Sequence, residues 1–119
     1  MSGSRRLPRY EVVPGDEALA DVVALAAYGP EVVAAAASII DDLAHGRVSG
    51  KPLGMRHVSG DLSGLARVKF DIPDWRPPRF RLVYRQIGES TREILAVGPR
   101  DEHAIYRTAV SRLAAGERP

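Results

Sequence analysis

The chain is predicted to fold as a single α+β domain, and three observations support this. Apolar residues recur at helical spacing in residues 16–44, whereas apolar and polar residues alternate in much of residues 64–97. The change of pattern falls in a stretch rich in Gly, Ser and Pro. A length of 119 residues is typical of one domain, so we expect one unit over residues 1–119, with residues 1–8 flexible.

The N-terminal part is predicted to form a short strand followed by a helical hairpin. Residues 9–13 suit a strand, which a Pro-Gly pair ends. An acidic capping residue opens a helix over residues 16–28, and a Gly-Pro pair separates it from a second helix over residues 30–44. Because the break is short, the two helices are expected to lie antiparallel. The apolar positions at helical spacing in the first helix are Leu19, Val22, Val23 and Ala26.

The C-terminal part is predicted to contain three strands and a last helix. Residues 46–63 are interpreted as a connecting loop, because Gly, Ser and Pro dominate them. Strands are expected over residues 64–72, 80–87 and 92–97, the first two separated by PDWRPP and the last two by a tight GES turn. A helix follows from about residue 102 to residue 114. The hairpin-linked strands should be antiparallel, with the helical hairpin on one face of the sheet.

The composition excludes several kinds of protein. The chain has no cysteine, which rules out disulfides and cysteine-based zinc sites. No apolar run approaches the ~20 residues of a membrane span, and no apolar segment follows the basic N-terminus, as a secretory signal requires. We therefore expect a cytoplasmic protein that does not contact membranes.

Charge is distributed unevenly along the chain. Residues 1–45 carry three Lys+Arg against seven Asp+Glu, a net charge of −4, whereas residues 46–119 carry 14 against eight, a net charge of +6. Most of these cations are arginines, which bind phosphate through two hydrogen bonds better than lysines do. The basic half is therefore a candidate surface for nucleic acid, although a solvated arginine-rich surface is an equally valid interpretation of charge alone.

Four basic residues are placed where they can share one surface. Arg67 and Lys69 are two residues apart in an expected strand, so both point to the same face. Arg81 lies in the next strand and can join them if that strand presents the same face. Arg100 follows the third strand through a V-G-P turn. Strand ends and the loops after them commonly carry functional groups.

The last helix adds three polar residues near its start. His103, Tyr106 and Arg107 are spaced three and four residues apart, so they can share a helix face, and a helix N-terminus favours a phosphate. Each of these residues alone is also typical of an ordinary solvated helix. Spacing by itself therefore indicates an anion site and nothing more specific.

Beyond this, the chain from Ala66 onward resembles the RelE/ParE toxin family of bacterial toxin–antitoxin pairs, and most closely its RelE-type branch. FRLVYR resembles the family's YRLVY-type strand. LAVGPRDEHAIYRTAVSRL resembles its closing block, in which the arginine of a V-G-x-R turn, here Arg100, is followed six residues later by a helical tyrosine, here Tyr106. The resemblance implies a RelE-like β-α-α-β-β-β-α fold, with an antiparallel sheet, a helical hairpin and a C-terminal helix.

The resemblance also implies an active site. The family has two basic residues at alternate positions of a strand, an arginine in the R-L-V-Y strand, a turn arginine and a helical tyrosine. The expected catalytic residues are therefore Lys69, Arg81, Arg100 and Tyr106, converging on one basic surface, and Arg67 is expected to bind substrate. His103 and Arg107 are expected to bind substrate as well, because their spacing places them on the helix face of Tyr106.

The chain departs from the best-known family pattern at Arg67, where that pattern has a lysine. Arginine holds its proton too tightly to be a good general base, but it binds phosphate well. The candidate bases are Lys69, Tyr106 and His103, because crowding of positive charges favours loss of a proton.

The function that the resemblance implies is a translation-inhibiting toxin that cuts mRNA on the ribosome. Such an endonuclease uses the 2′-OH of RNA as its nucleophile, needs no metal ion or other cofactor, and leaves a 2′,3′-cyclic phosphate and a 5′-OH. Its partners would be a cognate antitoxin, the ribosome and mRNA. Two alternatives remain: a ParE-type inhibitor of DNA gyrase, and a non-catalytic relative of the same fold that acts as a binding module.

Overall fold

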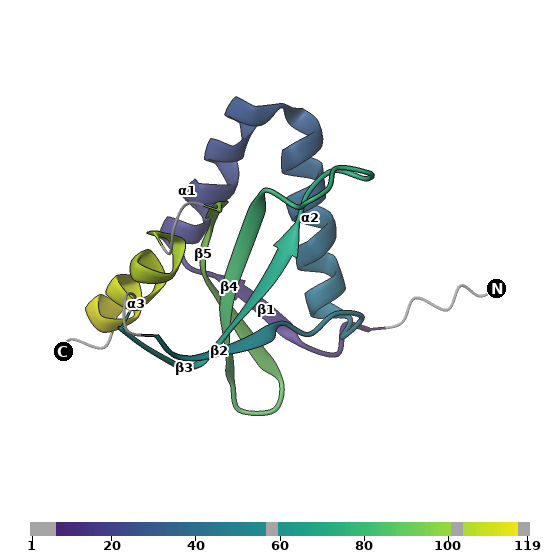
Figure 1. Cartoon of the computed structure of the whole chain (residues 1–119). Coiled ribbons are helices and arrows are strands. Elements are labelled where there is room, and N and C mark those ends of the chain that lie inside the picture. Colours follow the sequence, from purple (N-terminus) through teal and green to yellow (C-terminus); the bar gives the residue numbers. More distant parts are fainter. Residues whose placement is uncertain (1–6, 57–59, 101–103, 117–119) are drawn as a thin grey trace.

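The computed structural model describes residues 7–56, 60–100 and 104–116 and shows a five-stranded sheet covered by helices (Figure 1). The strand order is β1-β5-β4-β3-β2. All neighbouring strands are antiparallel except β1 and β5, which are parallel. The α+β class is confirmed. The elements are β1 (Glu11–Pro14), α1 (Asp16–Ala24), a 3-10 helix (Leu25–Tyr28), α2 (Pro30–Ala44), β2 (Lys51–Arg56), β3 (Gly60–Phe70), β4 (Phe80–Ile87), β5 (Thr91–Pro99) and α3 (Ala104–Gly116).

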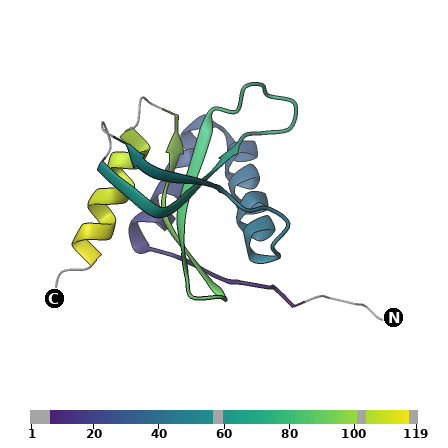
Figure 2. The same cartoon turned by 60° about the horizontal axis from the view of Figure 1, so that its bottom comes forward.

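The sheet lies between two layers of helices, with α1 and α2 on one face and α3 on the other (Figure 2). A separate apolar core forms against each face. Because side chains alternate between the two faces along β3 and β4, these strands contribute residues to both cores. Phe70 and Phe80 are buried towards α1 and α2, whereas Leu65 and Val83 are buried towards α3. Polar side chains of these strands that lie on the α3 face are therefore held by a backbone whose opposite face is packed in a core.

The expected loop over residues 46–63 is wrong, because it contains β2 and the start of β3. β2 pairs with β3 in antiparallel register, Lys51 opposite Arg67, with an irregularity between Pro52 and Gly54. The residues of β2 have low strand propensity, but they form a strand because they pair with β3. Strand formation depends on such tertiary context more than on the local preference of each residue. The sheet is consequently one strand wider than the sequence indicated.

The expected apolar face of the first helix is also wrong in part. Leu19 and Val23 are 50% and 73% exposed, whereas Ala18 and Leu25 are buried. The α-helix ends at Ala24 and continues as a 3-10 helix, which changes the residues that face the sheet. A small residue, Ala18, makes the buried contact at the start of the hairpin.

Arg92 fastens the segment between α2 and β2 to the sheet. Its side chain is buried, and its guanidinium donates hydrogen bonds of 3.0 Å to the carbonyl oxygens of Leu43 and Val48 and of 3.1 Å to Ser49 Oγ. Its plane also lies 3.8 Å from the ring centroid of Tyr10. A buried guanidinium is tolerated only when its donors are paired, and these bonds fix where β2 begins.

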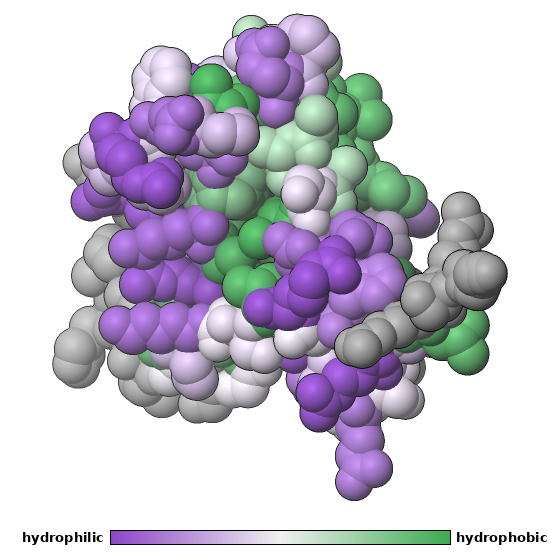
Figure 3. Space-filling model, turned by 90° about the vertical axis from the view of Figure 1, so that its right-hand side faces the viewer, coloured by the Kyte–Doolittle hydropathy of each residue, from purple (hydrophilic) through white to green (hydrophobic). Residues whose placement is uncertain are grey.

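The face of the molecule that carries α2 is chemically mixed. Hydrophilic side chains form two groups on it, with apolar side chains exposed between them (Figure 3). None of the helices in the described part of the chain combines the length and apolar character needed to cross a membrane. His103 and most of the segment 1–8 that was expected to be flexible lie outside the described residues.

Candidate functional site

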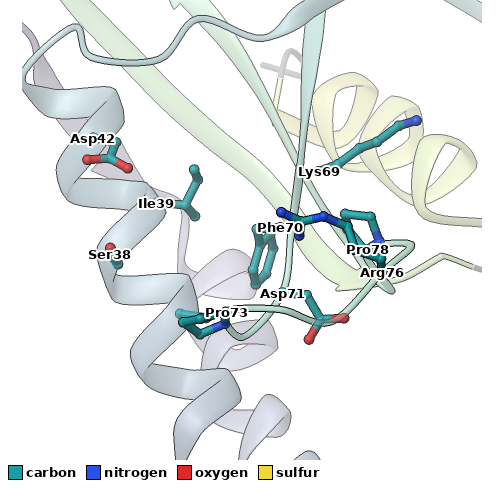
Figure 4. A pocket seen from close by; sticks show the side chains of 10 residues that line it. Ser38, Ile39, Asp42, Lys69, Phe70, Asp71, Pro73, Arg76 and Pro78 are labelled. Atoms are coloured by element: carbon teal, nitrogen blue, oxygen red, sulfur yellow. The ribbon is translucent and has the colours of Figure 1, made fainter.

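Three of the expected basic residues lie on the α3 side of the sheet. Lys69 and Arg81 are direct partners across β3 and β4, and Arg67 is two residues before Lys69 on the same strand. In Figure 4, Lys69 points away from α2 and towards α3, whereas Phe70 lies on the α2 side. Like charges directly opposite one another destabilise a sheet. This placement therefore costs stability unless an anion lies nearby.

Tyr106 on α3 meets two of these cations. Its ring is 6% exposed and packs in the core between α3 and the sheet. Its hydroxyl accepts a hydrogen bond of 3.3 Å from Arg67 Nη1, and Tyr106 also lies near enough to Arg81 to act on the pKa of that guanidinium. Guanidinium groups from two neighbouring strands thus lie close to one phenol.

Arg81 is the most deeply placed member of the group. It is 4% exposed, and its Nη1 donates to the carbonyl oxygens of Pro78 at 3.0 Å and Phe80 at 2.9 Å. Burial lowers the pKa of Arg81, and the interaction with Tyr106 opposes this change. The guanidinium is therefore held rigidly, with its positive charge beneath the surface.

Lys69 and Arg100 supply the exposed part of the site. The positive charge of Arg67, followed by that of Arg81, lowers the pKa of Lys69, and Arg100 acts in the same direction. Arg100 lies at the end of β5, where its backbone N–H donates to Arg79 O at 2.6 Å. The structure thus brings together Arg67, Lys69, Arg81 and Arg100, which we call the cationic cluster, around Tyr106.

Of the two other expected residues, one lies apart from this arrangement and the other is outside the described residues. Arg107 is exposed on α3 and is not among the described groups that shift the pKa of Lys69. His103 lies outside the described residues, so its expected role is untested. Within residues 7–56, 60–100 and 104–116, no group of three or more His, Asp or Glu side chains is arranged to hold a metal ion.

A clamp between Asp71 and Arg79 closes the long loop that joins β3 to β4. Arg79 donates from Nε at 2.8 Å and Nη2 at 2.9 Å to the Asp71 carboxylate, which also accepts the backbone N–H groups of Arg79 and Ile72. The Arg79 guanidinium lies 3.6 Å from the Trp75 ring centroid. The hydrogen bonds from Arg79 lower the pKa of Asp71 to about 2. Although the loop is long, the clamp therefore holds its two ends together, so that β3 and β4 pair with Lys69 opposite Arg81.

Stability should depend on the ionised Asp71 carboxylate. Because its pKa falls from 3.8 to about 2 on folding, its contribution should be complete above about pH 4 and should be lost as the pH falls towards 2. We expect Asp71→Asn to lower the free energy of unfolding by about 1–2 kcal/mol at neutral pH, a difference that shrinks in acid. Urea unfolding at several pH values measures this.

The matched control for that experiment is Asp74→Asn, in the same loop. Asp74 has a positive φ of 70°, a conformation that asparagine also adopts readily. This variant should unfold like the wild type at every pH. A destabilisation by Asp71→Asn that stays constant down to pH 2 would contradict the clamp.

Two hollows flank the β3–β4 loop. One, of about 360 Å³, lies between α2 and the loop and includes Ser38, Asp42, Asp71 and Arg76 (Figure 4). The other, of about 310 Å³, lies beside Arg100 and is lined by Tyr28, Pro77, Pro78, Arg79, Phe80, Pro99 and Arg100. Sequence reasoning missed Tyr28 and Arg79, although an Asp and an Arg at the two ends of a Pro-rich loop were a signal for the clamp.

Comparison with known proteins supports the fold. No protein-family model matches the chain, and none of the curated proteins matches it. A solved structure of the toxin RelE from E. coli, a double arginine-to-alanine mutant in the free state, is similar with a TM-score of 0.59. The similarity covers 88% of this chain and 98% of that chain, at 19% sequence identity. The chain therefore has a RelE-like fold.

Proposed function

We propose that this chain is the toxin of a type II toxin–antitoxin pair and that it cuts mRNA on the ribosome. The observation that carries the proposal is the cationic cluster around Tyr106, because it combines anchored and exposed cations with a phenol on one side of a sheet. The RelE-like fold supports it. A close set of like charges is costly in a purely structural surface, and a bound phosphate would offset that cost.

The cluster is suited to bind the scissile phosphate. Lys69 and Arg100 are exposed and can contact phosphate oxygens directly, while the buried Arg81 adds a fixed positive charge from below. Such fixed charges stabilise the extra negative charge that develops on the phosphate in the transition state, usually the largest contribution to catalysis.

The reaction requires two proton transfers. The 2′-oxygen attacks phosphorus while its proton passes to a base, and Lys69 fits this role because neighbouring guanidinium groups lower its pKa. The bond from phosphorus to the 5′-oxygen breaks, and that oxygen takes a proton from the Tyr106 hydroxyl. The products are a 2′,3′-cyclic phosphate and a 5′-OH. The burial of the Tyr106 ring favours this role over stacking on a base.

The proposal implies partners and a location. A toxin of this kind acts where translation occurs, in the cytoplasm, and a cognate antitoxin must restrain it. It needs no metal ion for charge stabilisation, because the cluster provides that charge itself.

The test is cleavage in a purified translation system, with 5′ ends mapped by primer extension. The wild-type protein should create new ends within the reading frame when the mRNA is translated, and far fewer when initiation is blocked. The new 5′ ends should accept phosphate from a kinase without prior dephosphorylation, as 5′-OH ends do. Complexes of ribosome, mRNA and toxin are isolated in salt that keeps them assembled. Adding a chelator to them should leave cleavage unchanged.

Two other results would reject the proposal. Intact mRNA together with inhibition of gyrase supercoiling would assign the protein to the ParE-type alternative. A protein that neither cuts mRNA nor inhibits gyrase, but binds a partner tightly, would be a non-catalytic binding module.

A further inference from the structure

The hollow beside Arg100, which we call the Tyr28 pocket, has the composition of a site for a flat ring. Among the residues that the structure describes, its lining contains two aromatic residues, three prolines and two arginines, and no acidic side chain. Its volume of about 310 Å³ is at the lower end of the range for ligand pockets. The two arginines of this described lining would attract a polyanion.

Tyr28 presents an aromatic surface at this pocket. The ring packs edge-on against buried Phe80, with centroids 5.1 Å apart and an interplanar angle of 78°, yet the residue is 49% exposed. One side of the ring is thus fixed while another remains accessible. An aromatic side chain held in this way stacks on a nucleobase with little loss of side-chain entropy.

Arg79 supplies a second rigid plane. Asp71 holds its guanidinium through two hydrogen bonds, and the Trp75 and Phe80 rings lie 3.6 Å and 5.0 Å from it. Its charge is largely neutralised by Asp71, so its contribution to binding is its shape. Arginine planes serve as stacking platforms for unpaired RNA bases.

Arg100 connects this pocket to the cationic cluster. Its side chain lines the pocket, and its charge acts on Lys69 in the cluster. The hydrogen bond from its backbone N–H to Arg79 O joins two of the residues that line the pocket. A phosphate on the cluster and a ring in the pocket would therefore lie on either side of one arginine, as the phosphate and base of neighbouring nucleotides do.

We propose that the Tyr28 pocket binds one nucleobase of the RNA strand whose phosphate lies on the cationic cluster. This inference rests on the proposed function and extends it, because it assigns a second subsite for the substrate. Stacking is tolerant of base identity, so the pocket should hold the strand in place rather than read its sequence.

The test uses fluorescein-labelled 2′-O-methyl RNA, which has no free 2′-OH and cannot be cleaved. One oligonucleotide carries all its bases, and a series carries a single abasic site at each position in turn. Binding is measured by fluorescence anisotropy at low salt, because phosphate contacts weaken as salt is added. The proteins are the wild type, Tyr28→Leu, Tyr28→Phe and Arg100→Ala, each checked by thermal melting.

The proposal predicts that removing the base from the RNA and removing the Tyr28 ring from the protein are not additive in their effects on binding. Removing the base at one position should weaken wild-type binding by about 5- to 100-fold, and Tyr28→Leu should weaken binding of the intact RNA by a similar factor. Tyr28→Leu should then be insensitive to the abasic site at that position. Tyr28→Phe, which keeps the ring, should behave like the wild type.

Other patterns would overturn it and separate it from the proposed function. If Tyr28→Leu keeps the wild-type sensitivity to every abasic site, or weakens all oligonucleotides equally, the pocket does not hold a base. The proposed function is not affected by that result, because cleavage on the ribosome tests it separately. If the wild type binds no RNA, or Arg100→Ala binds as tightly as the wild type, the pocket proposal fails, and the cleavage assay still decides the proposed function.

Discussion

Arg100→Ala is expected to lower the rate of mRNA cleavage by about 10²- to 10³-fold, the usual cost of removing one group that stabilises transition-state charge. Arg100 is exposed at the end of β5, so its loss should change the free energy of unfolding by no more than about 0.5 kcal/mol. Its removal also takes one positive charge away from Lys69, whose pKa should rise. Primer extension over a time course gives the rate, and urea unfolding gives the stability.

Arg47→Ala is the matched control for this variant. It removes the same charge from an exposed site, where Arg47 forms salt bridges with Asp41 and Asp42, and such exposed pairs contribute little to stability. Its cleavage rate should equal that of the wild type. Equal losses in Arg47→Ala and Arg100→Ala would mean that overall charge matters and that the cluster does not.

Tyr106→Phe should reduce cleavage by about 10²-fold or more, the typical contribution of a positioned proton donor or acceptor. The ring is buried in the α3 core, so phenylalanine preserves the packing that alanine would destroy; an alanine at this position would cost about 3–5 kcal/mol. Phenylalanine removes only the hydroxyl, which accepts the hydrogen bond from Arg67 and interacts with Arg81. Single-turnover cleavage on stalled ribosomes measures the chemical step.

Tyr84→Phe provides the corresponding control on the opposite face of the sheet. The Tyr84 hydroxyl accepts a hydrogen bond of 2.8 Å from the backbone N–H of Gly50, so its loss should cost about 1 kcal/mol of stability. Cleavage by this variant should be unchanged well below its melting temperature. Wild-type cleavage by Tyr106→Phe would remove the phenol from the mechanism.

The alternation of side chains along a strand made part of the cationic cluster predictable from the sequence. The register in which β4 pairs with β3 was not predictable. Arg67 and Lys69 share a face because strand side chains alternate, and that holds wherever the strand pairs. Their distance from Arg81 depends on where β4 pairs with β3, and the intervening loop hides this in the sequence. The Asp71–Arg79 clamp, which depends on two residues meeting in space, fixes the register.

The features that the sequence did not reveal arise from tertiary contacts. β2 contains Pro and Gly, and it is a strand because β3 offers it a partner. The exposure of Leu19 and Val23 follows from where α1 gives way to a 3-10 helix. The Tyr28 pocket joins the end of that helix to the ends of β4 and β5, which lie far apart in the sequence.

The two outer strands of the sheet have a consequence for how the protein behaves at high concentration. β1 has only four residues and ends at Pro14, and β2 is interrupted at Pro52, with Gly54 at a positive φ of 66°. Short or irregular edges offer few unpaired N–H and C=O groups in a straight row, and such rows are where sheets of separate molecules join and aggregate. The longer strands β4 and β5 are enclosed within the sheet. A sheet that is apolar on both faces is thereby protected from growing by the addition of further molecules.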